Sequence, residues 1–187
     1  MRRPIALLAA LAVCVPLAAL AYAKPHLLIE AAADVSCIQG VVCVDDERRT
    51  EEATRLYDEA LSFVATSIAP LDKKPLIVFC STELCYQSFG QTKATARSVG
   101  GFCIVIGPRG WKPYYVRHEM IHRLQWQHLG VVRMFMEPEW FVEGMAYALS
   151  EDPRSQLAEP FQSFRSNFLS WYSRVGKQRL WAEAERL

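Results

Sequence analysis

The sequence predicts an α+β fold in which a short mixed sheet precedes helices that continue to the C-terminus. Short apolar runs bounded by turn residues lie in the first part of the chain, where they are typical of strands. Apolar residues at helical spacing dominate the remainder. The chain has 187 residues, of which 51% are apolar, and this suits one core of ordinary size.

The first 23 residues are predicted to be a separate segment. Two arginines precede an apolar run from Ile5 to Ala23, and the last three residues of that run, Ala-Tyr-Ala, fit a signal-peptidase site. The run is also nearly long enough to cross a bilayer. We therefore expect a signal peptide or an N-terminal membrane anchor at 1–23, and a single exported domain, periplasmic or secreted, at 24–187.

Five cysteines follow this segment, as is common in chains that fold in an oxidising compartment. Cys37 with Cys43 and Cys80 with Cys85 are near enough in sequence to close two small loops. Cys103 would then be a buried strand residue. Other pairings, such as Cys80 with Cys103, stay open.

The charge balance argues against a nucleic-acid partner. Twenty-one Lys and Arg residues face 20 Asp and Glu residues, so the formal net charge is only +1. We expect membrane contact only through residues 5–23, if they are retained.

Residue patterns predict the elements of the first part of the chain. Helical spacing of apolar residues predicts a helix from Asp45 to Pro70. The polar stretch Ser81–Ser98 is expected to be a loop with one helical turn. Short apolar runs predict strands at His26–Ala32, Val41–Val44, Pro75–Cys80 and Phe102–Ile106.

Proline and glycine mark the helices of the second part. The range Pro113–Gly130 is predicted to be a helix, because proline favours the first helical position and glycine the position after the last. A second helix is expected between Pro138 and Pro153. Aromatic residues at helical spacing predict a third after Pro160, and a short last helix is expected around Trp181.

The first of these helices contains His-Glu-Met-Ile-His at residues 118–122. Residues four apart share a helix face, so His118 and His122 can reach one metal ion. Glu119 lies about 100° round the helix from His118, where it can reach the open position of the metal without binding it. The motif therefore predicts a zinc hydrolase in which Glu119 activates water.

A catalytic zinc ion needs a third protein ligand, and two candidates follow the motif. His128 has the spacing of an extended motif that requires a glycine where this chain has Gln125. Without that glycine the helix should continue, which places His128 about 240° round the axis from His122. Glu143, on the next predicted helix and between apolar residues, is the expected ligand. Gly144 beside it indicates tight packing, because glycine is a poor helix former.

HEMIH, followed about twenty residues later by WFVEGMA at 140–146, resembles the gluzincin metallopeptidases, the group that contains thermolysin and the zinc aminopeptidases. The resemblance covers roughly residues 75–150. It implies a zincin-like fold, one zinc ion bound by the two histidines and Glu143, and a peptide or protein substrate. Glu119 would be the general base of peptide-bond hydrolysis.

The resemblance also implies a place for the substrate, which would align along the strand Phe102–Ile106 by backbone hydrogen bonds. In one respect this chain departs from the family. Where the family often has an acidic residue supporting a histidine, this chain has Tyr147. Tyr147, Tyr114 and Tyr115 are candidates for a residue that stabilises the transition state.

Two other functions stay open. Two histidines and a carboxylate also describe the iron site of some oxygenases, although that site does not require a glutamate at the second motif position. The other alternative is a zincin-like module that binds a peptide or protein without turnover.

Overall fold

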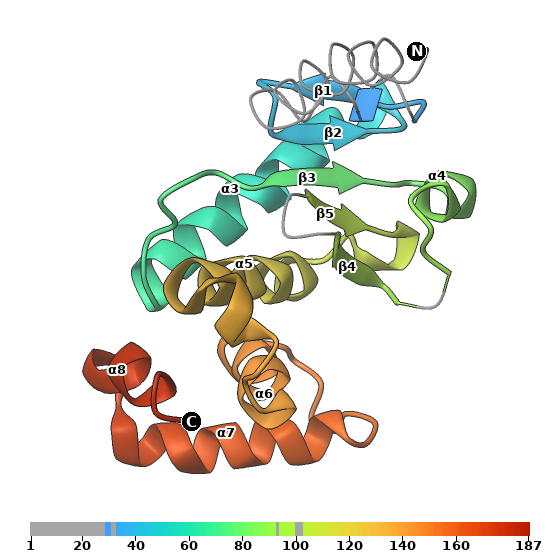
Figure 1. Ribbon diagram of the computed structural model, residues 1–187. Helices are drawn as coiled ribbons and strands as arrows, with labels where there is room; N and C mark the ends of the chain where they lie inside the picture. The colour runs from blue at the N-terminus through green and yellow to red at the C-terminus, as the bar shows by residue number, and fades with distance from the viewer. Residues whose placement is uncertain (1–28, 31–32, 93, 100–102) are drawn as a thin grey trace, which may run out of the picture.

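A computed structural model describes residues 29–187, apart from 31–32, 93 and 100–102 (Figure 1). The described chain is α+β, with one mixed sheet of five strands and a larger number of residues in helices. The predicted fold class is confirmed at this level. In the described residues no helix is both long and apolar enough to cross a membrane. The predicted leader at 1–23 lies outside them.

The sheet has the strand order β1-β2-β3-β5-β4. Its centre is parallel and consists of β2 (Val42–Val44), β3 (Leu76–Phe79) and β5 (Cys103–Ile106). An antiparallel strand lies at each edge, β1 (Ser36–Ile38) beside β2 and β4 (Ala96–Val99) beside β5.

Helices lie in the connections between the parallel strands. After the short η1 (Glu47–Arg49), α3 (Thr50–Ser67) joins β2 to β3, as a parallel pair requires. The short α4 (Glu83–Ser88) and β4 lie between β3 and β5. The chain then enters α5 (Pro113–Met134), which packs against α3 and β4.

Side chains of the central strands alternate between two apolar clusters, because successive residues of a strand point to opposite faces. Ile77 and Phe79 join the cluster that contains residues of α3 and α5. Leu76 and Val78 join Tyr86 of α4 on the other face. Burial on both faces explains why these strands are continuous apolar runs in the sequence.

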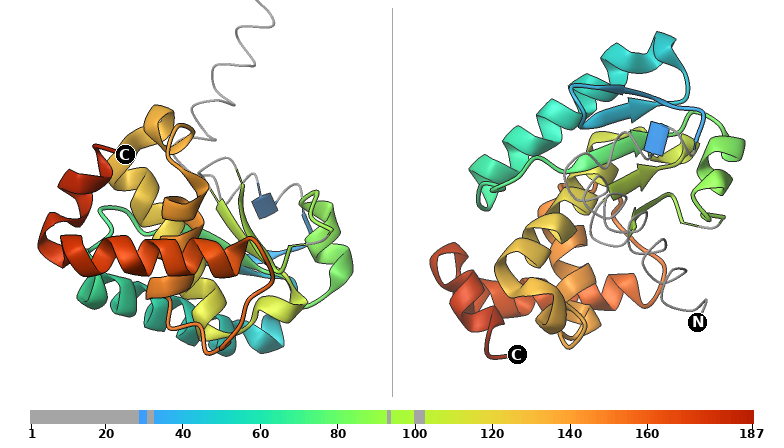
Figure 2. Two further views of the ribbon diagram at one scale, coloured as in Figure 1. Left: turned by 90° about the horizontal axis from the view of Figure 1, so that it is seen from below. Right: turned by 45° about the horizontal axis from the view of Figure 1, so that its top comes forward.

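The C-terminal third consists of helices. It contains α6 (Glu139–Leu149), α7 (Phe161–Val175), η3 (Lys177–Arg179) and α8 (Leu180–Ala184). Figures 1 and 2 show α7 crossing α6 on the side remote from the sheet. The contact between α6 and α7 is the most extensive between any two described elements.

Two disulfides hold short loops. Cys37–Cys43 links β1 to β2, and Cys80–Cys85 links the end of β3 to α4, so the predicted pairing is confirmed. Cys103 is free and buried in β5, where burial raises the pKa of its thiol to about 12. The disulfides indicate an oxidising location, as expected for an exported chain.

Some elements differ from the prediction. The stretch Ser81–Ser98, expected to be loop, contributes a strand as well as the helical turn α4, because β4 depends on pairing with β5. The strand β1 was not predicted. Only Ile29 and Glu30 of the expected strand His26–Ala32 are described, and their backbone is helical. Phe102, the expected first residue of β5, lies outside the described residues.

The two helices that carry the motif residues begin at their predicted positions. Gly130 (φ 75°, ψ 170°) interrupts α5 where an end was expected, but helical backbone resumes and continues to Met134. Such a positive φ favours glycine. Helix α6 begins after Pro138 and ends at Leu149, before the predicted end at Pro153.

Gly144 lies where α6 crosses α7. A Cβ atom at this position would be 2.8 Å from the Cβ of Phe168 and closer still to the carbonyl oxygen of Phe164. Both distances are far below van der Waals contact. The tight packing expected at Gly144 is therefore confirmed. The backbone of α7 lies so close that only glycine fits at this position.

We expect Gly144→Ala to destabilise the protein by about 1–3 kcal/mol, because α7 must move away from α6. Helix propensity alone would have the opposite effect, because alanine in place of glycine stabilises a helix by about 1 kcal/mol. Urea denaturation measures the difference. Ala148→Gly on the same helix is the control; its side chain is only partly buried, so the change should cost about 1 kcal/mol, mostly from helix propensity. A Gly144→Ala protein as stable as the original would contradict this account of the α6–α7 contact.

Candidate metal centre

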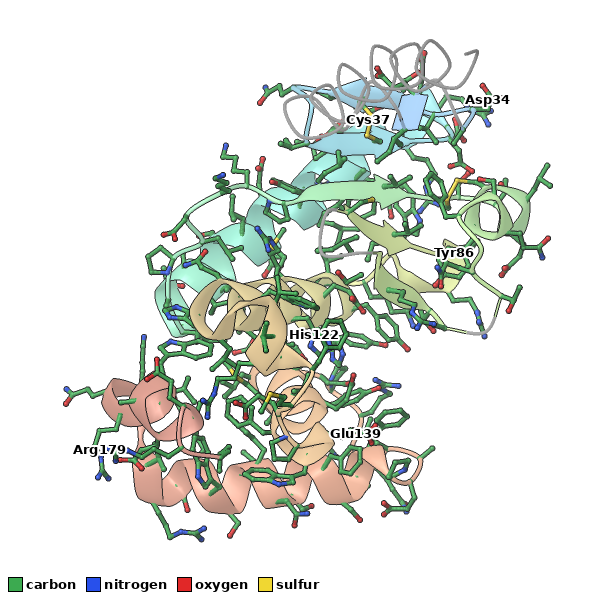
Figure 3. The ribbon with its side chains drawn as sticks, in the orientation of Figure 1. Asp34, Cys37, Tyr86, His122, Glu139 and Arg179 are labelled. Atoms are coloured by element: carbon green, nitrogen blue, oxygen red, sulfur yellow. A yellow bond between two sulfur atoms is a disulfide. The ribbon has the colours of Figure 1, made fainter. Side chains whose placement is uncertain are left out.

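Two histidines of α5 and one glutamate of α6 meet at the contact between these helices, near the labelled His122 in Figure 3. The Nε2 atoms of His118 and His122 are 3.0 Å apart, and each lies 3.6 Å from a carboxylate oxygen of Glu143. Ligand atoms about 2.1 Å from one tetrahedral zinc ion are about 3.4 Å apart. The donor atoms therefore have the spacing needed to share one metal ion.

The core fixes the rotation of α5. Val116 and Met120 are fully buried in the apolar core. A step of two residues turns about 200° round a helix, so His118 and His122 lie on the opposite side of α5. On that side α6 packs and presents Glu143.

Glu119, the predicted base, is buried beside these residues and is only 6% exposed. Burial raises the pKa of its carboxyl group to about 7, and the charge of Glu143 acts in the same direction. Opposing contributions come from His122, Arg97 and the backbone N–H of Ser98. A carboxyl group with a pKa near neutrality can both accept and release a proton.

The carboxyl group of Glu143 behaves differently. Burial alone would raise its pKa, but the neighbouring side chains of His118 and His122 outweigh that effect. Its pKa is therefore below the usual value. Glu143 is held as a carboxylate, the form that binds a metal ion.

Gln125 supports the centre in a way that the sequence analysis missed. Its side chain is fully buried, its Oε1 lies 2.9 Å from Nδ1 of His122, and its Nε2 donates to the carbonyl of Val142 at 3.0 Å. Because the amide oxygen faces the imidazole, Nδ1 carries the proton and Nε2 is free to bind a metal. The sequence does contain a sign of this contact, because residues three apart on a helix are neighbours and Gln125 follows His122 by three.

The three candidate tyrosines gather around Arg154, whose guanidinium lies 5.3–5.8 Å from their ring centroids. Tyr147 also contacts His118, with ring centroids 4.5 Å apart. Burial and a neighbouring carboxylate raise the pKa of Tyr147 to about 12. Tyr114 and Tyr115 contact each other, with centroids 4.4 Å apart. Tyr147 is thus the candidate that touches a histidine of the centre.

His128 belongs to a different contact. As expected, α5 continues through it, and its ring stacks on Trp181 of α8 with centroids 4.0 Å apart. The group of possible metal ligands found in the described residues does not include it.

The prediction that a substrate aligns along the strand Phe102–Ile106 is wrong. β5 pairs with β3 on one side and β4 on the other, so its backbone is already engaged along both edges. The edge strand is β4 (Ala96–Val99), which packs against α5. Its Ser98 N–H reaches the Glu119 carboxyl group. This edge therefore lies beside the buried glutamate.

A cavity of about 410 Å³ opens beside Glu143. Apolar side chains from the segment before α6, from α6 itself and from the start of α7 form most of its wall. The lining residues are Met134, Phe135, Glu137, Glu139, Val142, Glu143, Pro160, Phe161 and Phe164.

Comparison with known protein families, with curated proteins and with solved structures gives no match for this chain. The functional argument therefore rests on its own residues and their geometry.

We expect Gln125→Leu to weaken zinc binding about 10–100-fold, because His122 loses the group that orients its ring. Competition with a zinc chelator measures the affinity. Gln127→Leu is the matched control, since the Gln127 amide bonds to Pro70 and Asp72 instead. Equal losses in the two variants, or none in Gln125→Leu, would refute the supporting role.

Proposed function

We propose that the protein is a zinc-dependent metallopeptidase with a zincin-like fold. The observation that carries this proposal is the convergence of His118, His122 and Glu143 next to the buried Glu119. Two imidazoles and one carboxylate are a ligand set of catalytic zinc, and they leave a coordination position open. The motif's resemblance to gluzincins supports the same reaction.

The residues of the chain divide the chemistry between them. A zinc ion bound by the two histidines and Glu143 would polarise the scissile carbonyl and acidify a water molecule. Glu119 accepts a proton from the attacking water and then passes it to the leaving nitrogen. Gln125 holds His122 in the tautomer that leaves Nε2 available.

The edge strand β4 supports a peptide as the substrate. An extended peptide can add to a free sheet edge through backbone hydrogen bonds. Along Ala96–Val99 such a peptide would pass beside Glu119, and it would take over the Ser98 N–H that otherwise bonds to the Glu119 carboxyl group. The cavity beside Glu143 has the size and apolar wall to take a substrate side chain.

We expect the chain from Lys24 to Leu187 to purify with about one zinc ion per molecule. This length contains the complete described core, whose buried apolar side chains lie between Val42 and Ala184. Elemental analysis measures the metal.

Glu143→Ala should lose the metal, and His128→Ala should keep it. The reverse result would overturn the assignment of the third ligand. Failure to bind zinc even after incubation with it would remove the metal centre altogether.

Glu119→Gln should keep its zinc ion and lose turnover by about 10²–10⁴-fold, since the amide cannot accept the proton of the attacking water. Mass spectrometry of a peptide mixture incubated with each protein measures cleavage. Undiminished cleavage by Glu119→Gln would contradict the assigned base. Zinc binding without cleavage in the unaltered protein would favour the binding module.

A further inference from the structure

The cavity beside Glu143 combines an apolar wall with acidic groups. Six of its nine lining residues are apolar, and the other three are Glu137, Glu139 and Glu143. In the described part of the chain no lysine, arginine or histidine belongs to this wall. The proposed function uses Glu143 as a metal ligand, which leaves Glu137 and Glu139 without a part in the chemistry.

Glu139 lies one turn of α6 before Glu143. Residues four apart share a helix face, and one turn rises about 5.4 Å, so both side chains are on the side of α6 that borders the cavity. Glu139, labelled in Figure 3, is exposed. Its place in the first turn also suits the helix dipole. A separate reason is therefore needed to connect the acidic residues with a ligand, and Glu137 provides it.

Glu137 precedes α6 and is almost completely buried. Its side chain is 1% exposed, and Arg133 donates to its Oε1 at 2.8 Å. Its Oε2 is buried and has no hydrogen-bond partner among the described residues. Native proteins rarely leave a buried acceptor unpaired, because it has lost its water without gaining a partner. Since Glu137 lines the cavity, a cationic group bound there can supply the missing donor.

A long basic side chain fits such a cavity better than an apolar one. Lysine and arginine pack their methylene stems on apolar surface while the charged end reaches a polar group. The four-carbon stem of lysine is suited to the single helical turn that separates Glu139 from the metal ligand Glu143. An apolar side chain of the same length would remove water from Glu139 and give it no partner.

We propose that the cavity is a specificity pocket for lysine or arginine next to the scissile bond of the substrate. The stem packs on the apolar wall, the cation pairs with Glu139, and Glu137 supplies a second acceptor. This inference rests on the proposed peptidase function, because it assigns a side chain of the peptide that is cut at the metal centre. It narrows the substrate class to peptides with a basic residue at the cleavage site.

Peptide binding tests the pocket without catalysis. The Glu119→Gln protein is titrated with two fluorescent, otherwise neutral peptides, one with a single lysine and the other with norleucine in its place, and fluorescence anisotropy measures the affinities. We expect the lysine peptide to bind at least about tenfold more tightly. The difference should shrink as salt is added. Equal affinities, or binding of neither peptide, would overturn the proposal.

Glu139→Gln should remove most of the lysine preference, and Glu139→Lys should reverse it in favour of a peptide with glutamate at the same position. Glu83→Gln is the matched control, because Glu83 is also an exposed glutamate in the first turn of a helix but is not part of the cavity wall. Circular dichroism and zinc content check the fold of each variant. A lysine preference that survives Glu139→Lys, or that Glu83→Gln loses equally, would refute the role of Glu139.

Cleavage separates failure of the pocket from failure of the proposed function. In a peptide mixture analysed by mass spectrometry, the unaltered protein should cut beside lysine and arginine, and Glu139→Gln should lower kcat/KM at those sites at least about tenfold. Cleavage with no preference for basic residues would contradict the pocket and leave the peptidase assignment standing. Selective binding of the lysine peptide with no cleavage would support the pocket and contradict the peptidase assignment.

Discussion

The candidate metal centre depends on how closely α6 packs against two helices at once. His118 and His122 acquire their spacing from a single helix, so α5 alone brings them together. Glu143 comes from α6 and reaches them only across the contact between helices. Its neighbour Gly144 has no side chain, and the backbone of Phe164 approaches α6 at that point. Glu143 and Gly144 are consecutive, so the position of the Glu143 carboxylate depends on how α6 packs on α7.

A buried amide makes the contact between α5 and α6 specific as well as close. Apolar packing tolerates small shifts between helices, but an unpaired buried polar group costs about 1–3 kcal/mol. Gln125 satisfies its oxygen with His122 and its nitrogen with the carbonyl of Val142. A sliding movement of α6 would break one of these bonds. The amide that selects the imidazole tautomer thus also fixes the residue preceding Glu143.

The sequence predicted features with local causes and missed those with distant ones. Residues close together in the sequence determine three of these features: the histidine motif, the strands buried on both faces and the disulfide loops. The strand β4 contains Arg97 and Ser98 and exists through its pairing with β5, so its polar sequence resembled a loop. The error about the substrate strand follows directly, because β5 is an edge only if β4 is absent. Gln125 was missed similarly, since its partner Val142 lies on another helix.

One helix carries both of the candidate metal-binding histidines and, past its break at Gly130, the exposed side chains of Val131 and Val132. Gly130 is the joint between these two parts, because its positive φ turns the chain away from the axis of α5. Phe135 lines the cavity that Glu143 also lines, although most of the Phe135 side chain faces solvent. The cavity beside Glu143 therefore reaches the surface of the molecule at the exposed ring of Phe135.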